Sequence, residues 1–442
     1  MLLVYSKQIS PRLEYILQFI GDQLFDEPVK TTTSVADYLA SSGPKINYSL
    51  VDLIEDEFLI QPVALLFEEG IHPHRVDCFE LNYHKAFFQT SGDLHFDLFA
   101  ASFYLLSRYE EYLPHDKDLY GRYAHSNSLA FRESFLHQPL VNIWLHEFKI
   151  ALEAKFPDIV FRMEQFANLV TYDIDNAYAY LHKGFKRSVG GLMKALFKGR
   201  FSEALERWRV VTGKIEDPFD CYEWLDALHL YCRLNPYYFF LVAKTPGRYD
   251  KNVSTESRHF RELVEYYCST YTVGIHPSWQ SGDDKALLKE EKEWLDVVGD
   301  KEVTTSRQHY LRLSMPGTFR NLAEIGIQKE FSMGYGTING FRASVSSPFR
   351  WYDLERETST SLTVYPFCFM DATSFYRNNN SPEQAYHELM RLYDIVKKVN
   401  GMMITIWHND FLGTDKSKQG WREMFELYMK ETVYWDAYYD GR

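Results

Sequence analysis

The sequence is poor in cysteine and has no long apolar run. Its 442 residues include five cysteines, which are widely spaced and form no C-x-x-C pair. An odd number of isolated thiols predicts neither a disulfide framework nor a thiolate zinc site. No apolar run approaches the roughly 20 residues of a membrane-spanning helix, and the first residues lack the pattern of a secretory signal peptide. We therefore expect a cytoplasmic protein.

Positive charge is also scarce, while aromatic residues are abundant. The chain has 48 Lys and Arg against 61 Asp and Glu, which gives a net charge of -13. Because nucleic acids are bound through clustered cations, no nucleic-acid partner is expected. The 32 Tyr, 32 Phe and 9 Trp predict either large cores or surfaces that stack on sugars.

The length of the chain and the order of its apolar segments predict two domains of α/β class. Residues 1–160 alternate short apolar strands with helical patterns, which indicates a smaller α/β domain whose role the sequence does not reveal. Residues 161–442 contain seven apolar, strand-like segments separated by helices, a rhythm that favours a (β/α) barrel. Functional side chains are then expected at the carboxyl ends of the barrel strands.

One insertion departs from this rhythm. Residues 183–214 contain nine Lys or Arg against two Glu. This strongly basic helical stretch predicts a surface for an anionic partner, a peripheral membrane contact, or a lid over the strand ends. The alternative is a solvated helical face.

Two carboxylates stand two residues apart in the stretch VTYDID. If this stretch is extended, Asp173 and Asp175 project from the same face of the strand. Neighbouring carboxylates repel each other unless a proton or a cation is present. A divalent metal bound by one of them would leave the other free to act as a base on water. The alternative is that the pair caps the following helix.

Histidines and arginines mark the later strand ends. His276, in the turn sequence GIHPSW, is a candidate metal ligand. Arg307 and His309 alternate in a predicted strand and would share a face. Arg342, in GFRAS, is predicted to hold a carboxylate base by paired hydrogen bonds, or else to form an ordinary ion pair. His408, at the end of MMITIWHND, is placed to protonate a leaving group.

The order of these motifs resembles that of the NodB-homology polysaccharide deacetylases of carbohydrate esterase family 4. The motifs LVTYDID, GIHPSW, GFRAS and IWHND carry the resemblance over about residues 165–442. The whole chain is similar to bacterial members that have an uncharacterised N-terminal domain, here with the motif DLFAASFYLLSRYEEYLP.

This resemblance implies a deformed (β/α) barrel and a zinc-type hydrolase that removes N- or O-acetyl groups from a carbohydrate or glycan precursor. It implies that Asp173 is the general base and that Asp175 binds the metal. It further implies that Arg342 orients Asp173 and that His408 is the general acid. A metal-polarised carbonyl and a stabilised oxyanion would complete the chemistry.

One position departs from the family pattern. The metal turn normally has a second histidine where this chain has Gln280, and glutamine is a poor zinc ligand. His309 is the candidate replacement, so the predicted metal ligands are Asp175, His276 and His309. The alternative is a catalytically degenerate barrel that binds a glycan or a protein. A third hypothesis is a membrane-surface assembly factor that uses residues 183–214.

Overall fold

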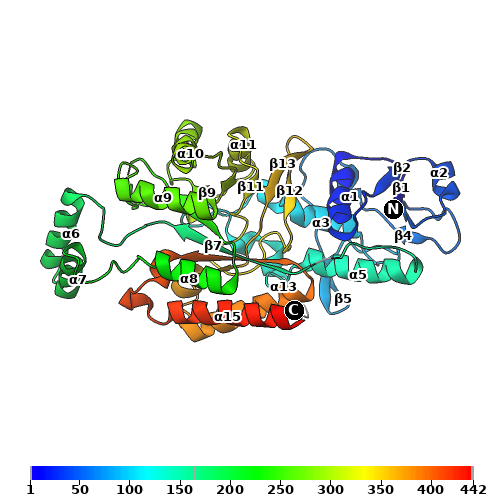
Figure 1. Cartoon of the computed structure of the whole chain (residues 1–442). Coiled ribbons are helices and arrows are strands. Elements are labelled where there is room, and N and C mark those ends of the chain that lie inside the picture. The colour runs from blue at the N-terminus through cyan, green and yellow to red at the C-terminus, as the bar shows by residue number, and fades with distance from the viewer. Residues whose placement is uncertain (1, 164, 246, 440–442) are drawn as a thin grey trace.

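The computed structural model describes residues 2–163, 165–245 and 247–439. Its strands form a four-stranded sheet near the N-terminus, a nine-stranded sheet in the rest of the chain and a two-stranded hairpin. Figure 1 shows the N-terminal sheet at one end of an elongated molecule and the helices of the basic insertion at the other end. The expected mixed α/β class is confirmed, because helices alternate with parallel strands in both larger sheets.

The N-terminal region is built on a small parallel sheet of order β2-β1-β3-β4. Ser10 accepts a hydrogen bond from the backbone N–H of Leu13 and Pro11 opens the first helix, so this helix has a strong N-terminal start. The elements here are β1 (Leu3–Ser6), α1 (Pro11–Leu24), β2 (Lys30–Thr32), α2 (Val35–Ala40), β3 (Lys45–Tyr48), β4 (Phe58–Ile60), η1 (Ala64–Phe67), β5 (Cys78–Leu81), β6 (His84–Phe87), α3 (Leu98–Leu106), η2 (Tyr109–Tyr112), η3 (His125–Asn127), α4 (Leu129–Arg132) and α5 (Leu140–Lys155).

The larger region is built on the nine-stranded sheet. Its elements are β7 (Ala167–Ile174), α6 (Phe185–Phe197), α7 (Phe201–Val211), α8 (Tyr222–Cys232), β8 (Tyr237–Leu241), α9 (Arg258–Thr270), β9 (Thr272–His276), α10 (Lys285–Gly299), β10 (Thr305–Ser306), η4 (His309–Leu311), α11 (Gly317–Glu324), β11 (Lys329–Glu330), β12 (Phe349–Asp353), β13 (Thr358–Val364), β14 (Phe369–Met370), α12 (Asp371–Tyr376), α13 (Pro382–Lys398), β15 (Met402–His408), α14 (Asn409–Leu412), η5 (Lys416–Lys418) and α15 (Trp421–Tyr439).

The strand order of the larger sheet is β12-β13-β11-β10-β9-β8-β7-β15-β14. Only the pair β12 and β13 is antiparallel. Among the described strands no pairing joins β12 to β14, so the sheet is open and the closure expected of a barrel is not seen. The carboxyl ends of β7, β9, β10 and β15 nevertheless meet at one edge, where parallel α/β sheets build their sites.

Two of the expected strands differ from the sequence-based prediction. Residues 337–344, which contain GFRAS, have irregular backbone, so Arg342 does not stand at a strand end. The strand expected over residues 305–314 ends after Ser306, and the chain turns at Tyr310, whose φ is 58°. Two consecutive left-handed backbone positions, at Tyr310 and Leu311, interrupt the extended conformation there.

Close packing at a glycine shapes the middle of the larger sheet. A Cβ atom on Gly274 would lie 2.6 Å from the Phe239 ring and 2.8 Å from the Thr305 carbonyl oxygen. Only glycine lets β9 approach β8 and β10 this closely. The Phe239 ring in turn lies 4.4 Å from the guanidinium of Arg307, so this packing positions a charged residue of the site.

The two sheets share one apolar core. A single cluster of buried hydrophobic residues extends from Leu2 to Met429 among the described residues. Backbone hydrogen bonds also join the regions: Phe341 donates to the Leu136 carbonyl over 2.8 Å, and Val141 donates to the Ser344 carbonyl over 2.9 Å. The boundary predicted near residue 160 falls between α5 and β7 and stays a prediction.

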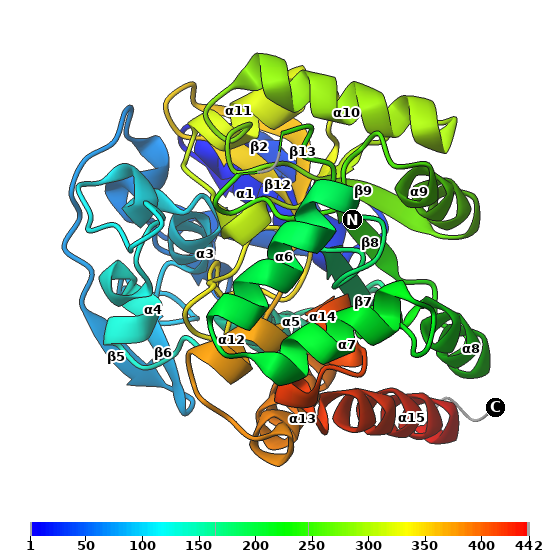
Figure 2. The ribbon, with the colours of Figure 1, turned by 90° about the vertical axis from the view of Figure 1, so that its left-hand side faces the viewer.

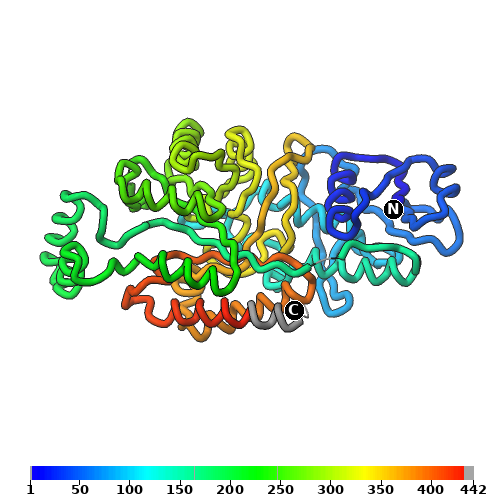
Figure 3. The backbone as a smooth tube through the Cα atoms, viewed as in Figure 1, coloured from blue at the N-terminus to red at the C-terminus, as the bar shows by residue number. Residues whose placement is uncertain are grey.

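The basic insertion forms the helices α6 and α7. Figure 3 shows that the chain leaves β7, runs out through both helices and returns toward α8. In Figure 2 the two helices lie in front of the edge where the parallel strands end. No helix in the part of the chain that the structure describes is both long and apolar enough to cross a lipid bilayer.

Candidate metal centre and active site

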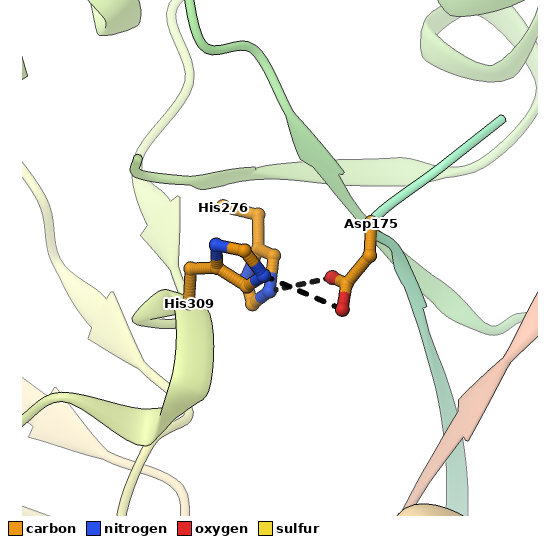
Figure 4. Close-up of side chains that lie close together, drawn as sticks. All are labelled: Asp175, His276 and His309. Atoms are coloured by element: carbon orange, nitrogen blue, oxygen red, sulfur yellow. Dashed lines mark ion pairs between the residues drawn. The ribbon is translucent and has the colours of Figure 1, made fainter. Parts of the chain in front are cut away.

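Three side chains with metal-ligating atoms converge at the carboxyl edge of the larger sheet. Asp175 follows β7, His276 ends β9 and His309 follows β10. Their ligand atoms all lie within 4.8 Å of one another, and Figure 4 shows both imidazoles pointing toward the carboxylate. The three residues that the sequence predicted as metal ligands are thus brought together.

His276 and His309 each use Nδ1 for a hydrogen bond, and Nε2 of each ring faces Asp175. His276 donates from Nδ1 to the carbonyl oxygen of Arg307 over 2.6 Å. His309 donates from Nδ1 to the carboxylate of Asp250 over 2.9 Å. Second partners of this kind fix the tautomer and the orientation of metal-binding histidines. In the neutral rings, each Nε2 therefore carries a lone pair.

The carboxylate of Asp175 meets these nitrogens directly. Its Oδ1 lies 3.1 Å from Nε2 of His276, and its Oδ2 lies 3.4 Å from Nε2 of His309. The Oδ1 atom is buried and accepts no hydrogen bond. Lone pairs that face one another at these distances need a proton or a cation between them. Two imidazole nitrogens and one carboxylate form a donor set that Zn²⁺ accepts, so the residues fit a divalent metal.

The electrostatics of the cluster reflect this closeness. Burial alone would raise the pKa of Asp175, but His309 and His276 hold it well below its usual range. Burial would lower the pKa of His309, but Asp175 and Asp250 together raise it to about 9. The cluster is therefore arranged around a positive charge on or beside the imidazoles.

Asp173 lies beside the cluster and is held by an arginine. It is the last residue but one of β7, is buried, and accepts a hydrogen bond over 2.7 Å from Nη1 of Arg307. Its other oxygen lies 3.9 Å from Nε2 of His276. The Arg307 guanidinium also donates from Nε to the Phe331 carbonyl oxygen over 3.0 Å, which fixes its orientation. Asp173 is thereby positioned next to the candidate metal ligands.

The predicted contact between Arg342 and Asp173 is wrong. Arg342 donates instead to both carboxylate oxygens of Glu111, from Nε over 2.8 Å and from Nη2 over 2.5 Å. The reason is that GFRAS forms no strand and packs against the N-terminal region, which supplies Glu111. Arg307 takes the place beside Asp173. Its alternation with His309 in a predicted strand had marked it as a member of the site face but not as the partner of Asp173.

A further pair of a histidine and an acid stands beside the cluster, with its histidine on the strand next to β7. His408 ends β15, and its Nδ1 donates to Oδ1 of Asp371 over 2.6 Å. Its Nε2 faces the cluster, 4.0 Å from Oδ2 of Asp175. Burial opposes the charge, but Asp371 and the nearby acids raise the pKa of His408 to about 10. The imidazole thus carries a proton near neutral pH.

Asp250 and Asp371 were missed by the sequence analysis. Asp371 directly follows the short apolar strand β14, and an acid at a strand end was a signal that could have found it. Asp250 lies in an irregular segment, and no local pattern marks it. Gln280, at the position where the family has its second histidine, does not join the cluster, whose third member is His309.

The cluster opens into a cleft of about 710 Å³. Most of its lining residues come from the larger region, but Tyr120 and Arg122 of the N-terminal region also line it. The Tyr120 ring lies 5.1 Å from the ring of Tyr310, and Tyr249 stacks on Trp279 at 4.1 Å. Aromatic faces of this kind are suited to the apolar faces of sugar rings.

Comparison with known proteins gives partial similarities. The model of a family of unknown function (DUF7033) matches residues 2–157. No curated protein matches the chain significantly.

Three solved structures align with 61% of this chain. A protein assigned to the polysaccharide deacetylases from Mycobacterium smegmatis has 13% identity and a TM-score of 0.39 over 84% of its own chain. A second, from Pseudomonas aeruginosa PAO1, has 11% identity and a TM-score of 0.39 over 85% of its chain. The polysaccharide deacetylase Bc1974 from Bacillus cereus has 11% identity and a TM-score of 0.29 over 89% of its chain. These values are too low to support an argument about function.

Proposed function

We propose that this protein is a metal-dependent hydrolase that removes acetyl groups from a carbohydrate, on a deformed barrel of the NodB type. The observation that carries the proposal is the convergence of Asp175, His276 and His309, with Nε2 of each imidazole facing the carboxylate. A divalent cation held there, most simply Zn²⁺, would polarise the acetyl carbonyl and lower the barrier to attack by water.

The chain's own groups account for the proton transfers. Asp173 is the candidate base, and Arg307 keeps it oriented toward the cluster. His408 is the candidate acid, because Asp371 orients its ring and favours its protonated form. Asp173 removes a proton from the attacking water, and His408 donates a proton to the departing amine or alcohol. A candidate base and a candidate acid beside one cluster fit a hydrolysis better than simple binding.

A zinc titration tests the first step of this proposal. Calorimetry on the chelator-stripped protein should show one tight zinc site. Substitution of any one ligand, in His276→Ala, Asp175→Ala or His309→Ala, should weaken binding at least tenfold, as expected for the loss of one of three ligands. His95→Ala, at an exposed position of the N-terminal region, is the matched control and should bind zinc normally.

Acetate release tests the second step. The zinc-loaded protein should release acetate from N-acetylated or O-acetylated oligosaccharides, and Asp173→Asn should abolish release while zinc affinity is kept. Zinc binding that ignores the three ligand substitutions would contradict the metal site. Tight zinc binding without acetate release from a broad panel would contradict the reaction.

The second candidate function is a glycan-binding module without catalysis. The aromatic rings of Tyr120, Tyr249 and Tyr310 around the cleft favour it, because stacking surfaces serve binding as well as turnover. Oligosaccharide binding by a protein that takes up no zinc would decide for this alternative.

A further inference from the structure

The hairpin of α6 and α7 exposes more apolar surface than any other segment of comparable length in the described chain. Ten of the 26 large apolar side chains that are exposed in the described residues lie between Phe185 and Ile215. They are Phe185, Val189, Met193, Leu196, Phe197, Phe201, Leu205, Trp208, Val211 and Ile215. Isolated exposed apolar residues are ordinary, but a concentration of this kind marks an interaction surface.

The exposed residues form a stripe on each helix. In α6, Phe185, Val189 and Met193 follow at intervals of four residues, and in α7, Phe201, Leu205 and Trp208 follow at intervals of four and three. Residues at these intervals share one helix face. The buried residues of the two helices are others, namely Ala195, Ala204 and Val210. In the described structure the stripes are left exposed, with Lys214 placed 4.0 Å from the centroid of the Trp208 ring.

The same hairpin concentrates positive charge. Residues 183–214 have nine Lys or Arg and two Glu, a net charge of +7 in a chain whose net charge is -13. Several of these cations, such as Lys186, Lys194 and Lys198, are exposed and have no carboxylate partner in the described structure. Lysines and aromatic residues on amphipathic helices are typical of segments that lie in the interface of an anionic bilayer.

The hairpin is attached beside the cleft. Arg187 donates to the carbonyl oxygens of Asn252 over 2.9 Å and Lys251 over 2.8 Å, and Lys251 lines the cleft. Figure 2 shows both helices in front of the carboxyl edge of the sheet. A surface that held this hairpin would therefore also lie close to the mouth of the cleft.

We propose that the hairpin of α6 and α7 docks the protein on a bilayer that contains anionic lipid. The apolar stripes enter the interface, and the lysines and arginines contact the lipid headgroups. Charge disfavours hairpin-to-hairpin pairing with a second copy of the chain, because two hairpins of net charge +7 would repel each other. The stripes favour a bilayer over a soluble polyanion, which offers no apolar phase. The proposal does not depend on the hydrolase function.

Vesicle sedimentation with the full chain tests the proposal. The protein should sediment with phosphatidylcholine vesicles that contain about one third phosphatidylglycerol, at least tenfold more tightly than with pure phosphatidylcholine, and about 0.5 M salt should weaken this binding strongly. The triple variant Phe185→Ser, Phe201→Ser, Trp208→Ser and the triple variant Lys186→Glu, Lys194→Glu, Lys198→Glu should each lose it. The matched control, Leu230→Ser with Val297→Ser, replaces exposed apolar residues of α8 and α10 and should bind normally.

A second readout reports insertion. Brominated lipid should quench part of the tryptophan fluorescence of the wild type, and Trp208→Phe should remove that part while the protein still binds. Equal binding to neutral vesicles, absence of binding at low salt, or unchanged binding by both triple variants would overturn the proposal. A dimer that forms through the hairpin in sedimentation analysis would also overturn it. The same holds if a soluble polyanion displaces the wild type and the apolar triple variant from vesicles equally well.

Discussion

Arg307 and Arg342 are two of the fully buried arginines of this protein, and each holds a carboxylate, yet they serve different regions. Arg307 holds Asp173 at the edge of the cleft, within the larger sheet. Arg342 holds Glu111, which comes from the N-terminal region and belongs to a closed network with Arg108 and Glu110. The first pair positions a buried group that lines the cleft, whereas the second joins two parts of the chain.

This difference shows that the role of a buried arginine has to be inferred from the carboxylate that it binds and from the place of the pair in the fold. In the interface, Arg342 and Arg108 outweigh the burial that would raise the pKa of Glu111, and they lower it to about 2. Such a pair strongly resists the loss of one member, because the other charge would remain buried. The pair of Asp173 and Arg307 is also buried, but Asp173 lines the cleft.

The largest effect that separates the two arginines is expected on the reaction rate. Arg307→Met should lower kcat for acetate release about 10²- to 10³-fold, because the base Asp173 loses its orientation. Zinc affinity should change little, since His276 bonds to the backbone carbonyl of Arg307 and not to its side chain. Steady-state kinetics and calorimetry on the same preparation measure both. A normal kcat of Arg307→Met would contradict the role of Arg307 in orienting Asp173.

Arg342→Met should act on stability instead. Removing it leaves Glu111 buried with Arg108 as its remaining partner, and breaking a buried pair costs about 3–5 kcal/mol of unfolding free energy. Urea unfolding checks this. The double variant Arg342→Met, Glu111→Gln should recover part of the loss, because no carboxylate then remains uncompensated. A large fall in kcat of the folded single variant, with unchanged stability, would contradict the structural role.

Glu330 provides a pH test, because the charges of both arginines act on it. Burial raises the pKa of Glu330 to about 7 despite Arg307, Arg342 and the hydrogen bonds from Ser332. A carboxyl with a raised folded pKa contributes stability that is complete below the unfolded pKa, 4.5, and is lost as the pH rises through about 7.

The unfolding free energy of the wild type should therefore fall relative to that of Glu330→Gln, by up to about 3 kcal/mol, between pH 4.5 and pH 8. Chemical denaturation of both proteins across this range measures the difference. A difference that stays constant with pH would show that Glu330 titrates in the same way in the folded and unfolded chains.

The smallest effect is expected from Tyr120, a residue of the N-terminal region that lines the cleft. Tyr120→Ala should raise KM for an oligosaccharide by up to about tenfold with little change in kcat, because one aromatic contact contributes about 0.5–1.5 kcal/mol. Leu119→Ala is the matched control, since Leu119 is exposed and adjacent. An equal effect of both substitutions would place the cause in the loop and not in the ring.

Much of the candidate site was predictable because its residues follow strands. Asp173 and Asp175 flank the last residue of an apolar strand, and His276 and His408 each end one. The carboxyl ends of parallel strands meet at one edge. The local sequence was therefore enough to predict that these side chains lie close together. The α/β class followed from the alternation of the same strands with helices.

Three features depended on the tertiary structure. Arg342 was misassigned because its motif packs against the N-terminal region in irregular backbone, and no local pattern reveals a partner 231 residues away in the sequence. Asp250 orients His309 from a loop that has no periodicity. The open edges of the larger sheet were also invisible, because the strand pattern does not reveal which strands pair.

The sequence by itself determined which side chains stand at the strand ends and that a basic, amphipathic segment interrupts the larger region, since both depend on residue order and short-range periodicity. Only the tertiary structure decided which arginine meets which acid, which second partners aim the imidazoles, and where the basic hairpin lies. Those choices depend on the packing of segments that are distant in the chain, and no short-range pattern encodes that packing.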